Sequence, residues 1–112
     1  MLILRYVARP RSDNPTAGKY AGAYINCWVS TASRAEARVV ARKEIRAAGW
    51  LPETCEEVTE VERSDFNAKP TSLASYDVAA RMGWAMTIHT WPKRRSRATA
   101  GVRSKKARSK GS

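Results

Sequence analysis

Two segments near the N-terminus alternate apolar and polar residues with the period of half-buried β-strands. Residues 2–9 (LILRYVAR) and 23–30 (AYINCWVS) both follow this two-residue period. Successive side chains of a strand point to opposite faces, so each segment needs a sheet that buries one face. Residues 10–22 between them are rich in Pro, Asn, Asp and Gly and predict a connection. Its 13 residues exceed the usual hairpin length, which favours a mobile or a binding loop.

Residues 33–48 carry the clearest helix signals in the chain. Ser33 can accept hydrogen bonds from the first-turn amides, and Glu36, three residues later, can reach back in a capping-box arrangement. Gly49 suits the left-handed conformation that follows many helices. The pattern therefore predicts a helix over 33–48 and assigns Trp50 to packing against it.

Three further segments complete the pattern. Residues 53–63 are rich in β-branched and acidic side chains and predict a strand at the edge of a sheet. In that strand, Val58 and Val61 can share one face only if a bulge intervenes. Residues 71–83 place apolar side chains at helical spacing, and residues 84–91 (WAMTIHTW) predict a last strand.

The predicted order of elements is ββαβαβ, and the predicted fold class is α+β. Two amphipathic helices among four strands most economically cover one face of a single four-stranded sheet, which gives a two-layer sandwich. The arrangement resembles ferredoxin-like domains in architecture only, because that fold begins strand–helix–strand. Residues 1–92 are expected to form a single α+β domain.

Three short motifs, AYINCW (23–28), EAR (36–38) followed by GW (49–50), and HTWP (89–92), resemble a group of small uncharacterised bacterial proteins. The resemblance covers roughly residues 1–92. It implies no function, and no site residue is carried over from it.

Positive charge is concentrated at the C-terminal end. The chain has 21 Lys and Arg against 10 Asp and Glu, a net charge of +11. Nine of the 21 basic residues lie in 93–112, which holds no acid, so 12 basic against 10 acidic residues leave the body at +2. This composition cannot bury a core, which predicts a disordered basic tail. Such a tail either binds nucleic acid nonspecifically or serves as a solubilising end. Its candidate contacts are Arg94, Arg95, Arg97, Arg103, Lys105, Lys106 and Arg108.

No apolar run approaches the roughly 20 residues that a membrane-spanning helix needs. Arg5 and Arg9 interrupt the segment where a signal peptide would need an unbroken apolar centre. The two cysteines, Cys27 and Cys55, are too few for a disulfide-based secreted scaffold and are expected to be reduced and packed. These features predict a cytoplasmic protein that does not bind a membrane.

The sequence lacks the motifs of common enzyme classes, such as a Gly-rich phosphate loop, a nucleophile elbow or paired His ligands on a helix. A small enzyme would need Cys27, Glu44 and His89 to converge in one pocket. Cys27, Cys55 and His89 would supply three zinc ligands, whereas structural zinc usually has four. We therefore expect no cofactor, no metal and no catalytic activity.

Glu44 falls among the apolar residues of the predicted helix, and a buried carboxylate needs a partner. In the favoured interpretation it bends to the rim of the helix and stays hydrated. In the alternative it meets a polar residue on the covered sheet face, the candidates being Arg5, Tyr24, Asn26 and His89.

Four arginines recur at every fourth position of the same helix and predict a basic ridge, formed by Arg34, Arg38, Arg42 and Arg46. Neither Glu36 nor Glu44 lies three or four positions from any of them, so the helix leaves their repulsion unanswered. We predict that acidic residues of the neighbouring strand balance the ridge, namely Glu56, Glu57, Glu60 and Glu62. An external anion is the alternative.

Tyr24, Asn26 and Trp28 alternate on one side of the second predicted strand. Aromatic side chains on an open sheet face stack bases in some RNA-binding modules. Core packing is the more common use, and the basic–aromatic octapeptide of the RNA-recognition fold is absent from the sequence. A protein partner or a second copy of the chain could also cover such a face.

Three functional hypotheses follow. The leading one is a small non-enzymatic binding module that engages a protein partner and whose tail adds weak, nonspecific affinity for nucleic acid. The first alternative is a dedicated nucleic-acid-binding protein that uses the sheet aromatics and the tail. The second alternative is a small enzyme around Cys27, Glu44 and His89.

Overall fold

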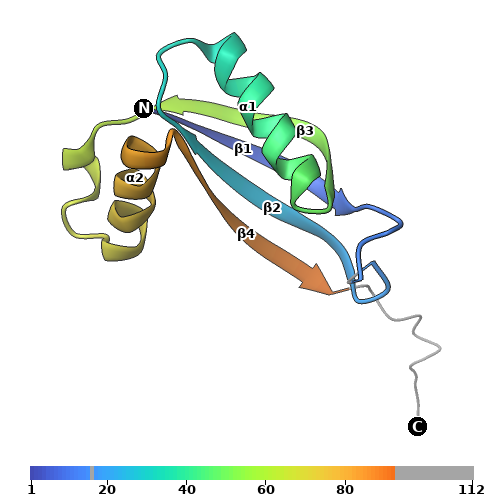
Figure 1. The fold of residues 1–112 in the computed structure, drawn as a ribbon. Helices are drawn as coiled ribbons and strands as arrows, with labels where there is room; N and C mark the ends of the chain where they lie inside the picture. Colours follow the sequence, from blue (N-terminus) through green and yellow to red (C-terminus); the bar gives the residue numbers. More distant parts are fainter. Residues whose placement is uncertain (16, 93–112) are drawn as a thin grey trace, which may run out of the picture.

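The structure is a computed structural model that describes residues 1–15 and 17–92. Within these residues the chain forms a four-stranded antiparallel sheet of order β3-β1-β2-β4 and two α-helices (Figure 1). The strands are β1 (Leu2–Pro10), β2 (Tyr20–Val29), β3 (Trp50–Glu60) and β4 (Trp84–Pro92). The helices are α1 (Arg34–Ala47) and α2 (Pro70–Met82), and a 3₁₀ turn, η1 (Arg63–Phe66), precedes α2. The α+β class and the order of strands and helices are confirmed, whereas the predicted disordered tail lies outside the described residues.

The N-terminus of α1 forms largely as its sequence predicts. Ser33 is the N-cap, and its side-chain oxygen accepts a hydrogen bond of 3.2 Å from the Glu36 amide. The Glu36 carboxylate does not close the predicted capping box, because it accepts a hydrogen bond of 2.8 Å from the Thr31 hydroxyl. The same hydroxyl oxygen accepts from the Ser33 amide at 3.1 Å. Thr31 therefore links Ser33 and Glu36, which a capping box would have joined directly.

The larger core lies between α1 and one face of the sheet. The helix contributes Ala37, Ala41 and Ile45, which are nearly inaccessible to solvent. Trp50, at the start of β3, packs in the same core as predicted. The central strands supply alternate residues to it, namely Leu2, Leu4, Tyr6 and Ala8 from β1 and Ala23, Ile25, Cys27 and Val29 from β2.

The second helix packs on the opposite face of the sheet, so the prediction that both helices share one face is wrong. Cys27 points toward α1, whereas its neighbour Trp28 packs with Ala79 of α2 and with Ala85 of β4. The ring of Phe66 meets Trp28 edge-on at a centroid distance of 5.1 Å. Because strand residues alternate in direction, β2 supplies apolar side chains to both helices. The ferredoxin-like architecture, which rested on the one-face placement, is not supported.

The predicted edge position of β3 is confirmed, but its bulges differ from the predicted one. The pairing of β3 with β1 shifts register twice, opposite the steps Arg5 to Tyr6 and Val7 to Ala8. The extra residues at these shifts are Glu56 and Glu53. No bulge is needed between Val58 and Val61, because the strand ends at Glu60. The chain thus places two acidic residues where the β3 edge bends.

The long connection between β1 and β2 is held against the end of α1. The Gly49 carbonyl accepts hydrogen bonds from the Arg11 amide at 2.9 Å and from the Asn14 side-chain amide at 2.8 Å. Gly49 has a φ of 94°, the left-handed conformation predicted for it. This backbone turns the chain from α1 into β3 and presents the carbonyl to the connection.

Replacing Gly49 with Ala tests this turn. An alanine at this position would have to keep a disfavoured positive φ, and its Cβ would lie 2.8 Å from the Asn14 side-chain nitrogen. We expect the free energy of unfolding, measured by urea denaturation, to fall by about 1–2 kcal/mol. Gly18→Ala is the control, because a Cβ at Gly18 meets nothing within 4 Å, and it should change stability by less than about 0.5 kcal/mol. Equal effects of the two substitutions would contradict the role of Gly49.

Candidate functional site

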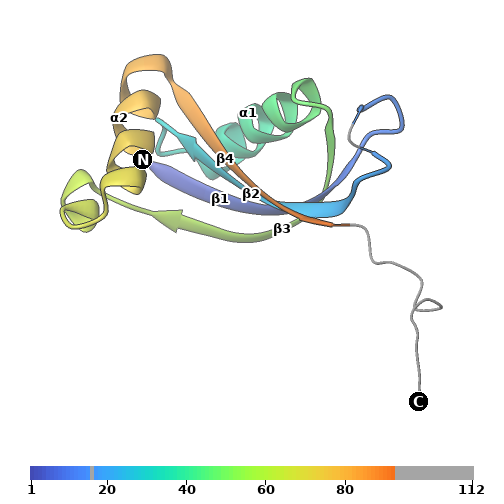
Figure 2. The same cartoon turned by 90° about the horizontal axis from the view of Figure 1, so that it is seen from below.

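One part of the sheet surface has no helix of the described residues over it. The face opposite α1 is covered by α2 only near the start of β1, and β2 and β4 run on beyond the helix (Figure 2). We call the uncovered part the open face. Its side chains are half-buried or exposed, and they are Arg5, Val7 and Arg9 of β1, Tyr24 and Asn26 of β2, and Thr87, His89 and Trp91 of β4.

Three of these side chains form a continuous stack across neighbouring strands. The Arg5 guanidinium lies over the Tyr24 ring, 4.5 Å from its centroid. The Tyr24 and Trp91 rings are 5.1 Å apart between centroids and tilted by 56°. Trp91 lies over Gly22, where a Cβ would collide with the indole. We call Arg5, Tyr24 and Trp91 the open-face stack, and Gly22 provides the space that it needs.

Charge divides the open face into two halves. Arg9 pairs with Glu53 at 3.2 Å, and Arg5 approaches Glu56 at 3.9 Å. All four side chains are more than two-fifths exposed, so these ion pairs contribute little to stability. The half nearest β3 is therefore electrically balanced. The half nearest β4 has no acidic residue, because the sequence of β4 contains none.

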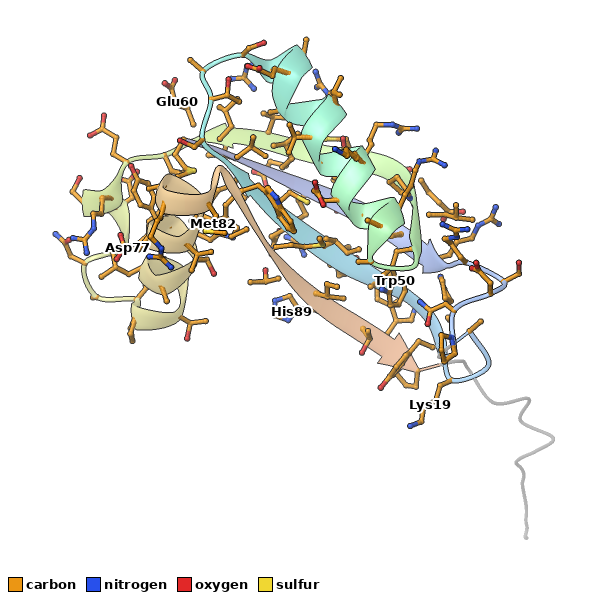
Figure 3. The ribbon with its side chains drawn as sticks, viewed as in Figure 1. Lys19, Trp50, Glu60, Asp77, Met82 and His89 are labelled. Atoms are coloured by element: carbon orange, nitrogen blue, oxygen red, sulfur yellow. The ribbon has the colours of Figure 1, made fainter. Side chains whose placement is uncertain are left out.

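The described chain ends beside the open-face stack. Pro92 pairs with Tyr20 and directly follows Trp91. Lys19 lies at the same end of the sheet, close to where β4 finishes (Figure 3). The basic segment 93–112 therefore continues from this end of the molecule. Its predicted contacts lie outside the described residues, namely Arg94, Arg95, Arg97, Arg103, Lys105, Lys106 and Arg108.

The structure separates the two aromatic residues that the sequence analysis placed together. Trp28 is 5% exposed because α2 covers it, whereas Tyr24 is half-buried on the open face. Core packing, the more common use of such a residue, is therefore confirmed for Trp28, and the alternative that places it on a surface is wrong. Sequence reasoning also missed the partners of Tyr24, which are Arg5 and Trp91. The pairings of Arg5 with Asn26 and of Gly22 with Trp91 bring them together, and the alternation within each strand was the signal available for them.

The basic ridge of α1 is exposed, and the predicted glutamate partners do not balance it. Arg34 donates a 3.3 Å hydrogen bond to the Val58 carbonyl. Within the described residues, none of the four ridge guanidiniums forms an ion pair, including those of Arg38, Arg42 and Arg46. Glu56 approaches Arg5 instead, and Glu62 takes part in capping η1. Among the described residues no ion pair joins the ridge to the four predicted glutamates, and the bulge at Glu56 places that side chain near Arg5 instead.

The three residues of the enzyme hypothesis do not converge. Cys27 lies in the core beneath α1, whereas His89 pairs with Tyr24 on the open face. Glu44 is partly exposed, as the rim interpretation predicts, and its four candidate partners lie on the other side of the sheet. Among residues 1–15 and 17–92, no three His, Cys, Asp or Glu side chains gather as metal ligands. A catalytic site built on these residues is not supported.

Cys27 and Tyr6 are two buried groups that hold their protons more tightly than usual. Burial raises the pKa of Cys27 to about 12, and the neighbouring Cys55 and Glu44 act in the same direction. Burial also raises the pKa of Tyr6 to about 12, and the adjacent Cys55 thiol adds to this effect. A thiol that keeps its proton is a poor nucleophile at neutral pH, so Cys27 is suited to packing.

Comparisons with models of protein families, with curated proteins and with solved structures find no match for the chain. The resemblance to small bacterial proteins therefore stays a prediction. Neither described helix is long and apolar enough to cross a membrane.

The raised pKa values predict a loss of stability in alkali. In the unfolded chain these thiol and phenol groups release their protons near pH 8.5 and 10. The folded chain holds both protons until about pH 12, so stability should fall as pH rises from about 9 toward 12. Urea denaturation across this interval should show a shallower fall for Cys27→Ala. A Cys27→Ala variant with an unchanged pH dependence would contradict this assignment.

Proposed function

We propose that this protein binds single-stranded nucleic acid with little sequence preference, through the open-face stack and the basic segment 93–112. The observation that carries the proposal is the position of the stack. Tyr24 and Trp91 lie on a sheet surface that neither described helix covers, and the nine basic residues begin directly after Pro92. Aromatic rings beside a positively charged path are the shared features of proteins that bind single strands.

The two parts would contribute different interactions. The exposed side of the open-face stack offers a surface on which unpaired bases can stack, and every base has a suitable ring face. The bases of a duplex are already stacked on one another, so this contact favours single strands. The basic segment would supply phosphate contacts, which depend on salt and carry no sequence information.

The charge of the body sets a direction for the bound strand. Glu53 and Glu56 balance the arginines of the β3 half of the open face, so this half offers phosphates no net attraction. The β4 half has no acidic residue. A nucleic-acid strand would therefore cross the face along β2 and β4, with its phosphates toward the segment that follows Pro92.

Recognition of a protein partner is the second candidate function, and a separate surface favours it. Val78 and Met82 of α2, which are 38% and 68% exposed, line an apolar groove together with Trp84 and Met86 of β4, and Ile88 farther along β4 is 40% exposed. Exposed apolar groups that gather in one place commonly mark protein contacts. This surface does not overlap the open-face stack, so the two functions do not exclude each other.

The stack can be tested by replacing its rings while keeping apolar volume. We expect Tyr24→Leu and Trp91→Leu each to weaken binding of a labelled oligothymidylate on the order of tenfold, because one stacked base contributes about 1–3 kcal/mol. Fluorescence anisotropy measures the affinity, and circular dichroism checks that each variant folds. With 4–6 phosphate contacts, the log of the affinity should fall with log salt at a slope of about −3 to −4 on a single strand.

Two double variants with equal charge loss separate the open face from the ridge of α1. Arg5→Gln with Arg9→Gln should weaken binding more than Arg38→Gln with Arg42→Gln, because it removes a member of the open-face stack and leaves Glu53 and Glu56 unbalanced beside the bound strand. A chain ending at Pro92 should bind more weakly, with a smaller salt slope, and should still respond to Tyr24→Leu. If the ring variants bind like the original chain and the shortened chain does not bind, then the basic segment acts alone and the proposed face is wrong.

A further inference from the structure

The two edges of the sheet are protected to very different degrees. The β3 edge has two register shifts and carries Glu53, Glu56, Glu57 and Glu60, features that discourage pairing with another strand. The β4 edge spans nine residues, and its sequence WAMTIHTWP holds no Lys, Arg, Asp or Glu. Both edges belong to the same sheet, so the contrast does not come from the overall composition. The free edge of β4 has the chemistry of a strand that accepts another strand.

An apolar groove continues this edge. It lies between α2 and the start of β4 and encloses about 510 Å³. Val78 and Met82 of α2 and Trp84 and Met86 of β4 are among its lining residues. An adjacent side of α2 packs on Trp28 through Ala79, which holds the helix beside the strand. Figure 3 shows Met82 on α2 near this edge.

The chemistry of the edge restricts what can occupy it. The basic segment 93–112 does not fit, because it carries nine positive charges and the groove offers no acidic side chain. The β3 edge of another molecule does not fit either, because it is bulged and acidic and would form a contact that continues into open chains. A second β4 does fit, since it is uncharged, of equal length and apolar at Met86 and Ile88.

We propose that two copies of this chain form a symmetric dimer in which their β4 strands pair in an antiparallel manner. The twofold axis passes near Ile88, the middle residue of Trp84–Pro92. Backbone groups of each free edge then find partners in the other copy, as in strand addition. Pro92 of one copy lies opposite Trp84 of the other, at the mouth of its groove. This inference specifies the partner in the second candidate function and does not depend on nucleic-acid binding.

The charge of the C-terminal segments favours the antiparallel direction. Antiparallel pairing starts the two basic segments at opposite ends of the paired strands, roughly 30 Å apart for nine residues at ~3.4 Å each. This distance exceeds the screening length of about 8 Å at physiological salt. Parallel pairing would begin both segments side by side, so their repulsion selects against it.

The dimer would have one continuous eight-stranded sheet, because each copy contributes four strands. Residues directly opposite in the paired strands share a face, so both open faces lie on the same side. The two α1 helices lie on the other side. The two open-face stacks then flank the twofold axis on one surface.

The oligomeric state of the full-length chain tests the dimer. After nuclease treatment and in high salt, sedimentation equilibrium should give twice the mass of one chain. Ile88→Lys places a charge at the twofold axis and should give the mass of a single chain. Val39→Lys is the matched control, because Val39 is 68% exposed on α1, and it should leave the dimer intact. A single-chain mass for the original protein would overturn the proposal.

A second variant reports the geometry directly. Cβ atoms directly opposite in antiparallel strands lie about 4.5–5.5 Å apart, close to the distance that a disulfide spans. Ile88→Cys should therefore give a covalent dimer under mild oxidation, whereas Val39→Cys and the original chain should not. If Ile88→Lys fails to fold, Met82→Glu disrupts the groove instead and should also give single chains. A dimer that survives these charged substitutions and does not cross-link through Ile88→Cys would place the interface elsewhere.

Discussion

The central strand β2 supplies side chains to two separate cores, and the rest of the structure depends on this division. Ile25 and Cys27 point into the core under α1, whereas Trp28 points the other way and is buried under α2. Alternation along a strand is a geometric necessity, so apolar residues at adjacent positions require a cover on each side. The Arg63 guanidinium supports the second cover by donating to Asp77 of α2 at 2.9 and 3.1 Å.

The helices α1 and α2 cover unequal areas of the two sheet faces, and this difference leaves part of the sheet open for binding. The helix α1 spans the middle of its face, but α2 reaches only the end where Trp28 lies. Tyr24 lies four residues earlier on the same face of β2. Neither described helix covers it, and it packs with Arg5 and Trp91 instead. The same short cover leaves the start of β4 beside an apolar groove. Base stacking and strand pairing would thus both use parts of the sheet that α2 does not cover.

Electrostatics separates the arginines of β1 from those of α1. Those of β1 face glutamates that the bulges of β3 bring toward them, and their charge is largely balanced. Those of α1 extend into solvent, and among the described residues they form no ion pairs. A near-neutral body can therefore still present a cationic helix on one side and a mixed aromatic surface on the other. Net charge alone did not reveal this arrangement.

The sequence by itself determined the type and order of the strands and α-helices and the ends of α1, because local signals control them. It placed β3 about three residues too late, over 53–63, whereas the strand spans Trp50–Glu60. The Ser33 cap and the left-handed Gly49 and Gly83 set the limits of the two helices, and the alternation of apolar residues located the strands. It also indicated that 93–112 is a basic segment. Tyr24 was recognised as a candidate contact for the same reason, since its position in a strand is a local property.

Only the tertiary structure decided which face each helix covers, which residues meet across strands and where the edges lie. The side chains of Trp28 and Tyr24 lie on the same face of β2. The position of α2 alone makes Trp28 a core residue and Tyr24 a surface residue. The register of β2 with β4 brings Trp91 over Gly22, a pairing between residues far apart in the chain. Such contacts depend on the summed packing energy of the whole sheet, which no local pattern of residues records.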